Sequence, residues 1–283
     1  MGTLSVLNNI PSLQAQNQLA LTGAALQNTL GQLSSGSRIN SGSDDAAGLE
    51  IANGLNANIT ALTQSASNAT DAVGELQTAD GALSQITTLL NSAVTLATEA
   101  ASGTVTSTQQ AALDTQFQAI SSEIGNIGAN TTYNGQAIFS AGSSLAVFMS
   151  DGTSTGTSTL KVSLGQVDAS HLGTSGGSAV SISSDALTDA TKAASALTDI
   201  NNAISGVAAL RGSLGASVNQ LQAATNVMNN QVQNLTTGMS NIESANIGQD
   251  VADMTKYSIL QQTGIAALQQ ANQASQAVLK LLQ

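Results

Sequence analysis

The chain contains no cysteine and no tryptophan, and Pro11 is its only proline. Its 283 residues include only three phenylalanines and two tyrosines. Large aromatic side chains dominate the energetics of most globular cores, whereas alanine, serine, threonine, asparagine, glutamine and leucine dominate here. This shortage favours long, thin contacts between helices over a globular core. The absence of cysteine excludes disulfides but fixes no compartment by itself.

Basic residues are also scarce. Six Lys and Arg stand against seventeen Asp and Glu, which gives a net charge of −11. A chain this acidic has no basic stripe to displace counterions from nucleic acid, and it is repelled by anionic membranes. No run approaches the roughly 18 apolar residues of a membrane span. No basic residue precedes Arg38, so the N-terminus does not resemble a secretory signal peptide. We therefore expect no nucleic-acid and no membrane partner.

The residues that enzymes use are not grouped in this chain. His171 is the only histidine, whereas a zinc site needs three or four convergent ligands. No glycine-rich phosphate loop follows a strand. Adjacent acids such as Asp44 and Asp45 point in different directions on a helix, and helix capping accounts for them. We predict no catalytic residue, no metal, no cofactor and no enzymatic activity, with His171 on the surface.

Periodicity is the strongest signal. Two ladders with alternating four- and three-residue steps predict long coiled-coil helices, each on the order of 80–90 Å long at about 1.5 Å per residue. The first contains Leu55, Ile59, Leu62, Ala66, Ala69, Val73, Leu76, Asp80, Leu83, Thr87, Leu90, Val94, Ala97 and Ala101. The second contains Ala186, Ala190, Ala193, Leu197, Ile200, Ile204, Val207, Arg211, Leu214, Val218, Leu221, Thr225, Met228, Val232, Leu235, Met239 and Ile242.

Shorter patterns complete the fold prediction. A ladder from Leu113 to Ile127 predicts an antiparallel third helix after a turn at 102–104. Ser43, Asp44 and Asp45 are expected to supply an N-cap and two acids in the opening turn of the first long helix. Residues 131–184 are rich in Gly, Ser and Thr, and alternation at 144–149 and 159–164 around 151–152 predicts a β-hairpin.

Both ends are predicted to be helical. The first carries a seam of Leu19, Gly23, Leu26, Leu30 and Leu33, and the last carries Leu260, Gly264, Ala267, Ala271, Ala274, Val278 and Leu281. Small residues allow close approach, and the flanking leucines leave an apolar strip that one helix pair does not hide. The two ends could pair within one chain, or neighbouring subunits could add to the contact. Arg211 either binds an acid such as Asp80 or extends into solvent.

These residues carry a family resemblance. Leu33, Ser34, Ser35, Gly36, Ser37, Arg38, Ile39, Asn40 and Ser41, followed by residues 44–48, resemble the N-terminal signature of bacterial flagellins. The segment 133–135 resembles that family's aromatic-Asn-Gly turn. Residues 259–264, which include Leu260, Gln262 and Gly264, and residues 269–273 with 278–282, which include Ala271, Asn272 and Leu281, resemble the C-terminal signature.

The resemblance implies a mainly α fold: a long antiparallel coiled-coil rod with helical termini and a small β-hairpin excursion. Residues 1–42 and 243–283 would form the inner filament tube, 43–130 and 185–242 the long-helix rod, and 131–184 the β-rich excursion of a short family member. The implied function is a secreted, extracellular filament subunit for motility, exported through the flagellar type III apparatus. Implied partners are further copies of the chain, a secretion chaperone, and cap and junction proteins.

One departure from the family concerns innate immune recognition. Flagellins sensed by the Toll-like flagellin receptor carry arginines and a glutamate around a leucine on the first long helix. Alignment through the ladder places Ser92 and Val94 where the arginines would stand and Thr95 in place of the acid, while Leu96 is kept. We hypothesise that the chain is a poor receptor agonist. The alternatives to a flagellin are a hook–filament junction protein, or an acidic coiled-coil adaptor or adhesin.

Overall fold

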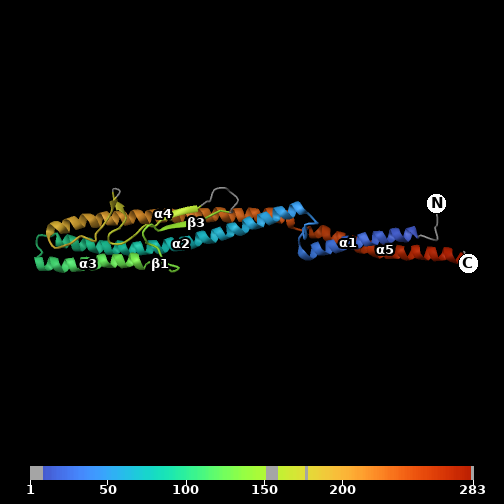
Figure 1. Cartoon of the computed structure of the whole chain (residues 1–283), viewed down its shortest axis with the longest axis horizontal. Helices are drawn as coiled ribbons and strands as arrows, with labels where there is room; N and C mark the ends of the chain where they lie inside the picture. The colour runs from blue at the N-terminus through green and yellow to red at the C-terminus, as the bar shows by residue number, and fades with distance from the viewer. Residues whose placement is uncertain (1–8, 151–158, 176–177, 282–283) are drawn as a thin grey trace. The chain divides into compact units, whose positions relative to one another are not determined.

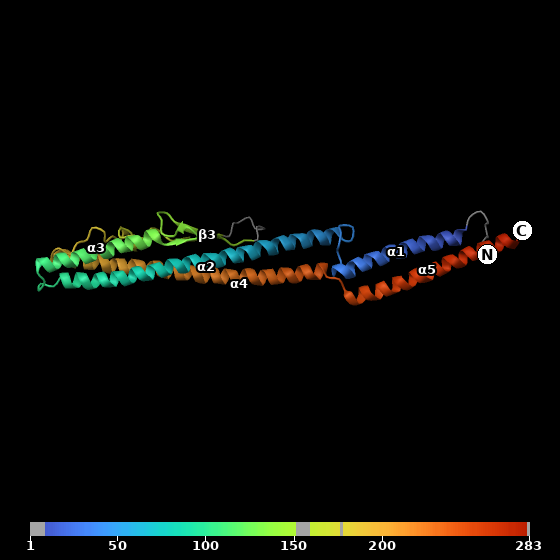
Figure 2. The same ribbon diagram turned by 90° about the horizontal axis from the view of Figure 1, so that it is seen from below.

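The computed structural model describes residues 9–150, 159–175 and 178–281, and these are mainly α-helical, as predicted. Its helices are α1 (Ile10–Ser35), α2 (Ala46–Ala100), α3 (Ser107–Asn130), α4 (Ala190–Glu243) and α5 (Ile247–Leu281). The chain forms two compact units. We call 1–57 with 234–283 the terminal unit and 58–233 the rod unit. Helices α1 and α5 lie side by side in the first, and the second contains α3 together with most of α2 and α4, which lie side by side (Figures 1 and 2).

The described residues of the excursion between α3 and α4 form three antiparallel strand pairs. Their members are β1 (Thr132–Tyr133) with β2 (Gln136–Ala137), β3 (Ser144–Phe148) with β4 (Thr159–Ser163), and β5 (Thr174–Ser175) with β6 (Ser178–Ala179). The β3–β4 pair confirms the predicted hairpin, although its predicted turn at 151–152 lies outside the described residues. Asn134 and Gly135 have φ of 48° and 77°, as a tight two-residue hairpin turn requires.

Local sequence explains where the helices begin and end. Thr106 and Gln109 form a reciprocal capping box at the start of α3. The Asp189 carboxylate accepts the backbone N–H groups of Thr191 and Lys192 at 3.0 and 2.9 Å, which caps α4. Gly36 ends α1 with a left-handed φ of 69°, a conformation that glycine adopts without strain.

The buried stripe of α2 differs from the predicted seam by one residue in half of its positions. The series Leu62, Ala69, Leu76, Leu83, Leu90 and Ala97 is buried as predicted. The other predicted series is half-exposed at Val73, Thr87 and Val94. The buried residues are instead one position earlier: Ser65, Ala72, Ala79, Ile86, Ala93 and Ala100. Because α2 packs in a three-helix layer, its buried face is broader than a two-helix seam.

Helix α4 repeats this shift. Ala193, Ile200, Val207, Leu214, Leu221 and Met228 are buried as predicted. Ala196 and Ala203 are also buried, whereas the predicted Leu197 and Ile204 are only half-buried. The smaller residue therefore takes the position closest to the neighbouring helix, and the larger one covers the edge of the contact.

The extended backbone of the excursion packs directly against two helical glycines. A Cβ added at Gly128 of α3 would overlap the carbonyl oxygen of Val167, and one at Gly206 of α4 would overlap that of Leu172. Gly212, also on α4, has nothing within 4 Å of the same hypothetical atom. Glycine is therefore a packing requirement at the first two positions and not at the third.

We predict that Gly128→Ala lowers the free energy of unfolding by about 2 kcal/mol or more, because either the α3 helix or the excursion must shift. The matched substitution Gly212→Ala should instead stabilise the exposed helix surface by roughly 0.5–1 kcal/mol. Chemical denaturation of both variants would measure the difference. Equal effects would contradict the proposed close packing.

Candidate functional site

The terminal helices α1 and α5 form an antiparallel pair with a heptad interface. The less exposed residues of α1 follow the spacing Ser12, Ala15, Leu19, Thr22, Leu26, Thr29 and Leu33. Those of α5 follow Met254, Tyr257, Gln261, Gly264, Leu268, Ala271 and Ser275. This confirms the predicted pairing of the two ends within one chain. The interface excludes Leu30, Leu260, Ala267 and Ala274, which were predicted on the seams and are exposed.

The most deeply buried side chains of α1 are polar, whereas several large aliphatic side chains of the pair are exposed. Thr22 and Thr29 are 5% and 6% exposed, whereas Leu13 and Leu21 are 58% and 66% exposed. Both buried threonines donate to carbonyl groups of their own helix, Thr22 to Gln18 at 2.8 Å and Thr29 to Ala25 at 3.0 Å. These bonds satisfy the hydroxyls without joining the helices. The apolar surface predicted from the flanking leucines is present, and on α5 it includes Ile259, Leu260 and Ile265.

Several signature residues hold the two helices in register. The side-chain amide of Asn9 donates to the carbonyl of Ala271 at 3.3 Å, and the Ser12 hydroxyl donates to Asn272 Oδ1 at 3.0 Å. A Cβ on Gly264 would lie 3.2 Å from Leu19 Cδ1. Gln262 is exposed. Leu281 is the last residue of α5, and its side chain lies outside the described positions.

The other signature forms a joint between the α1–α2 loop and the α4–α5 junction. Arg38 donates from its backbone N–H to Glu243 O at 2.6 Å and from Nη2 to Ile242 O at 2.8 Å. Ala245 N–H donates to Gly36 O at 3.1 Å. A cationic side chain on the last carbonyls of α4 complements the negative end of the helix dipole. Ser34 and Ser35 are exposed beside this joint, and Leu33 is half-buried in the pair interface.

Asp44 and Asp45 follow this joint, and their carboxylates accept hydrogen bonds from backbone N–H groups. Asp45 Oδ1 accepts the Gly48 N–H at 2.9 Å and caps α2. Asp44 Oδ2 accepts the N–H groups of Asn40 and Ser41 at 3.0 and 2.9 Å. These hydrogen bonds, the one from Asn40 foremost, lower the pKa of Asp44. Neither acid lies in the first helical turn, so the prediction of a Ser43 cap followed by two helical acids was wrong: the helix begins two residues later, at Ala46.

In the rod unit, Arg211 binds Asp80. Its Nε lies 2.7 Å from Oδ1 and its Nη2 lies 3.2 Å from Oδ2, which decides between the two alternatives left by the sequence. Both side chains are about 40% exposed, so the bond contributes little to stability.

His171 is exposed and its Nδ1 lies 3.0 Å from Asp168 Oδ1. Within the described residues, no three potential ligands are close enough to hold a metal ion.

The residues of the receptor patch lie on α2 in the rod unit. Ser92 and Thr95 are exposed, and their hydroxyls donate to the carbonyls of Thr88 and Asn91, each at 3.2 Å. Val94 and Leu96 are half-buried. The two positions aligned with the family's arginines therefore differ: Ser92 faces solvent, while Val94 borders the buried stripe of the helix.

No described helix is both long and apolar enough to cross a membrane.

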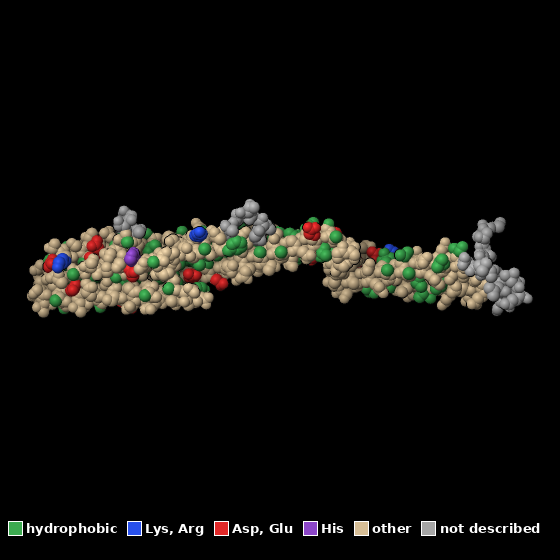
Figure 3. Space-filling view, viewed as in Figure 1, with side chains coloured by type: hydrophobic (Ala, Val, Ile, Leu, Met, Phe, Trp, Pro, Cys, Tyr) green, Lys and Arg blue, Asp and Glu red, His purple; other side chains and the backbone are tan. Residues whose placement is uncertain are grey.

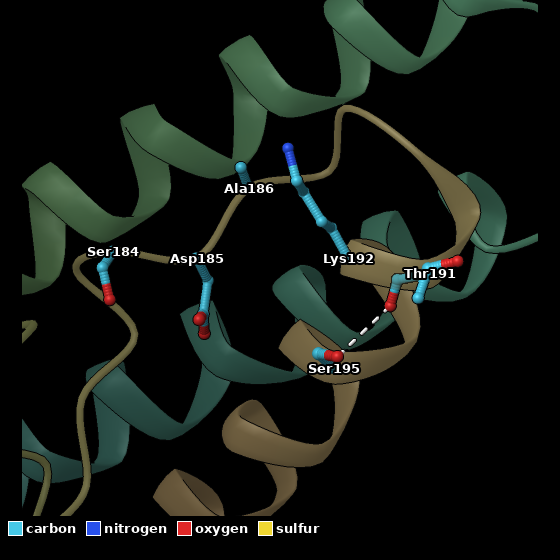
Figure 4. Close-up of a pocket in the computed structure, with 6 residues that line it drawn as sticks. All are labelled: Ser184, Asp185, Ala186, Thr191, Lys192 and Ser195. Carbon is cyan, nitrogen blue, oxygen red and sulfur yellow. Dashed lines mark hydrogen bonds between the residues drawn. The ribbon is translucent and has the colours of Figure 1, made fainter.

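A cavity of about 360 Å³ at the start of α4 was not predicted. It is lined by Ser184, Asp185, Ala186, Thr191, Lys192 and Ser195 (Figure 4). Asp185 Oδ2 is buried without a hydrogen-bond donor. Desolvation, followed by repulsion from Asp199, raises the pKa of Asp185 to about 6. Lys192 does not compensate this charge, because it pairs with Asp189 at 3.6 Å. Sequence carries no signal for this acid, since its burial depends on the loop path.

We predict that Asp185→Asn stabilises the protein at pH 7. The folded-state pKa of about 6 exceeds the ordinary value of 3.8, so the ionised carboxylate costs stability above pH 6 and the cost is relieved as pH falls from 6 towards 4. After discounting for solvent screening, the gain at pH 7 is about 1 kcal/mol, or roughly 2–4 °C in Tm. Thermal melts between pH 7.5 and 5 should show that the gain shrinks with acidification.

Asp189→Asn is the matched control for this prediction. It removes one charge from the same end of α4, but Asp189 is exposed and asparagine caps helices equally well. Its melts should follow the wild-type pH dependence. A gain of similar size in both variants would attribute the effect to net charge rather than to the buried oxygen.

Comparison with known proteins agrees with this architecture. Residues 6–144 match the family model of the bacterial flagellin N-terminal helical region, and residues 197–282 match that of the C-terminal helical region. The flagellin of Halalkalibacterium halodurans is 32% identical over 97% of this chain and 98% of its own length. The flagellin of Bacillus subtilis is 30% identical over 99% of this chain and 100% of its own length.

Among solved structures, a protein described as flagellar hook-associated, from Vibrio parahaemolyticus, aligns with a TM-score of 0.58 at 16% identity. The alignment covers 71% of this chain and 100% of that one, and it concerns the fold alone. The near-full-length flagellin matches do not favour the junction-protein, adaptor or adhesin alternatives. The chain therefore belongs to the bacterial flagellins, the structural subunits that polymerise into the extracellular flagellar filament.

Proposed function

We propose that the α1/α5 pair is the assembly surface of this flagellin and forms the inner tube of its filament. The supporting observation is the burial pattern of the pair, in which Thr22 and Thr29 are buried while large aliphatic side chains such as Leu21 and Ile259 are exposed. Fully burying one such aliphatic side chain is worth about 1.5–3 kcal/mol. Neighbouring copies would gain this energy on stacking, whereas the isolated chain leaves it unused.

The wider assignments follow from the same proposal. Residues 1–42 and 243–283 form the tube, 43–130 and 185–242 form the surrounding rod, and 131–184 form a small outer excursion. The chain acts without catalysis. It leaves the cell through the flagellar type III apparatus and meets a secretion chaperone, cap proteins and junction proteins on the way to the filament. Membership of the family supports each of these steps.

Deleting the last forty residues should abolish filament formation and leave a helical core that melts cooperatively, because α5 is removed while the rod unit keeps its contacts. Electron microscopy and circular dichroism would test both halves of this expectation. Filaments formed by the truncated chain would contradict the role of the terminal pair.

A pair of point substitutions sharpens the same test. Leu21→Ala combined with Ile259→Ala removes exposed side chains from the terminal pair, and Val227→Ala removes a comparably exposed one from α4. The double variant should raise the critical concentration for assembly. The α4 variant should raise it less, with the monomer's Tm unchanged in both cases.

We also propose that the chain is a weak agonist of the Toll-like flagellin receptor. An arginine at the centre of an interface is a typical hot spot worth more than 1–2 kcal/mol. In this chain Ser92 and Val94 stand at the two positions, so both arginine contacts are missing. The loss of two such residues weakens binding by about a hundredfold or more.

Ser92→Arg with Val94→Arg should partly restore signalling in receptor-expressing cells. Since Val94 is half-buried, the single variant Ser92→Arg serves as the better-tolerated comparison, and melting curves must show that both variants fold. The proposal fails if the unmodified protein already signals as strongly as a potent enterobacterial flagellin.

A further inference from the structure

Charge is distributed unevenly along the chain. No Asp, Glu, Lys, Arg or His occurs in residues 1–37 or in residues 257–279. All seventeen acids lie between Asp44 and Asp253. In the terminal pair, α1 is therefore uncharged throughout and α5 is uncharged between Lys256 and Lys280, although the protein has a net charge of −11.

This neutrality is unusual for helices that expose so much surface. In a two-stranded coiled coil that remains in solvent, the positions flanking the seam usually carry Glu and Lys, and soluble surfaces are about 25–35% charged. In α1 and α5 the exposed positions carry amides and aliphatic groups instead, among them Gln14, Gln16, Gln262 and Gln269. On the face in Figure 3, the outer stretch of the pair shows only apolar and uncharged polar side chains.

Amide side chains suit a surface that becomes buried. Each glutamine has both donors and acceptors, so two glutamines from different copies satisfy one another without a counter-charge. An isolated charge in the same place loses its hydration and has no partner of opposite sign. At the start of α5, Lys256 pairs with Asp253 at 3.2 Å, whereas Asp250 Oδ2 is buried without a hydrogen-bond partner.

We propose that the exposed perimeter of the α1/α5 pair contacts the same perimeter of other copies through aliphatic packing and neutral amide hydrogen bonds, and that this contact excludes charge of either sign. The proposal rests on the assembly role given above and adds a rule about its chemistry. Apart from Asp250 and Asp253 at the start of α5, the acids lie on the remainder of the chain, where they do not enter this contact.

A competing explanation makes the opposite prediction for one sign of charge. If the net charge of −11 governed assembly at this surface, an added lysine would reduce repulsion between copies and favour polymerisation. An added glutamate would oppose polymerisation. Salt would weaken this repulsion between copies by shortening the Debye length to about 8 Å at 0.15 M. Exclusion of charge predicts that both residues oppose assembly.

The experiment compares full-length chains that carry Gln16→Glu, Gln16→Lys, Gln262→Glu or Gln262→Lys. Both positions are exposed in the monomer, so circular dichroism melts should match wild type. We expect every charged variant to raise the critical concentration for assembly about tenfold or more, which corresponds to about 1.4 kcal/mol per added subunit. Raising the salt to 0.5 M should not restore wild-type assembly.

Two controls accompany these variants. Gln262→Met keeps the length and neutrality of the side chain and should assemble within about twofold of wild type. Gln222→Glu and Gln222→Lys place the same charges on an exposed position of α4, outside the terminal pair but within residues 212–242, which are also uncharged, and should have smaller effects than the matching changes at Gln262.

The outcomes separate this proposal from the assembly role. If the lysine variants assemble as well as wild type or better, charge exclusion is overturned and the net field governs the contact. If all charged variants assemble normally, the perimeter is not buried in the polymer. If the wild-type chain forms no filaments under any condition, the assembly role itself has failed.

Discussion

Close approach of helices through small side chains is the constraint on which this structure depends. In the rod unit, alanines occupy four of the six positions of one buried series of α2, and Ala196 and Ala203 lie in the matching series of α4. Alanine buries little apolar area, so each turn of contact contributes little at about 25 cal/mol per Å². Stability must then come from many turns, which is why two helices of more than fifty residues form the core. With only five aromatic residues, the chain cannot instead form a globular core of large aromatic side chains.

The small area buried per helical turn also explains why the terminal pair differs from the rod unit. Its interface includes hydroxyl groups that bond within their own helix, at Thr22 and Thr29, and small residues such as Gly264. Such an interface permits close approach but adds little binding energy between α1 and α5. Several large aliphatic side chains of these helices, such as Leu21 and Ile259, are exposed instead. The isolated chain therefore leaves them available for the assembly contact proposed above.

Element type and order could be predicted from the sequence, but the rotational phase of the helices could not. In α1, α2, α4 and α5, one series of seam positions was predicted correctly and the other was displaced by one residue. Both choices have a 3.5-residue period, so periodicity does not separate them. Hydrophobicity selects the bulkier candidate, such as Leu30 over Thr29 or Leu197 over Ala196. Close packing selects the smaller one, and this preference depends on the neighbouring helix.

The signature residues of the family divide into two physical groups, and the isolated chain explains only one of them. Gly36, Arg38 and Asn40 build the joint between the α1–α2 loop and the α4–α5 junction, through a left-handed cap and hydrogen bonds to backbone and carboxylate groups. Leu260 and Gln262, by contrast, are exposed. A folding role accounts for the first group, and also for Gly264 and Asn272, which hold α1 and α5 in register. Leu260 and Gln262 are exposed in the isolated chain, as the proposed contact between copies requires.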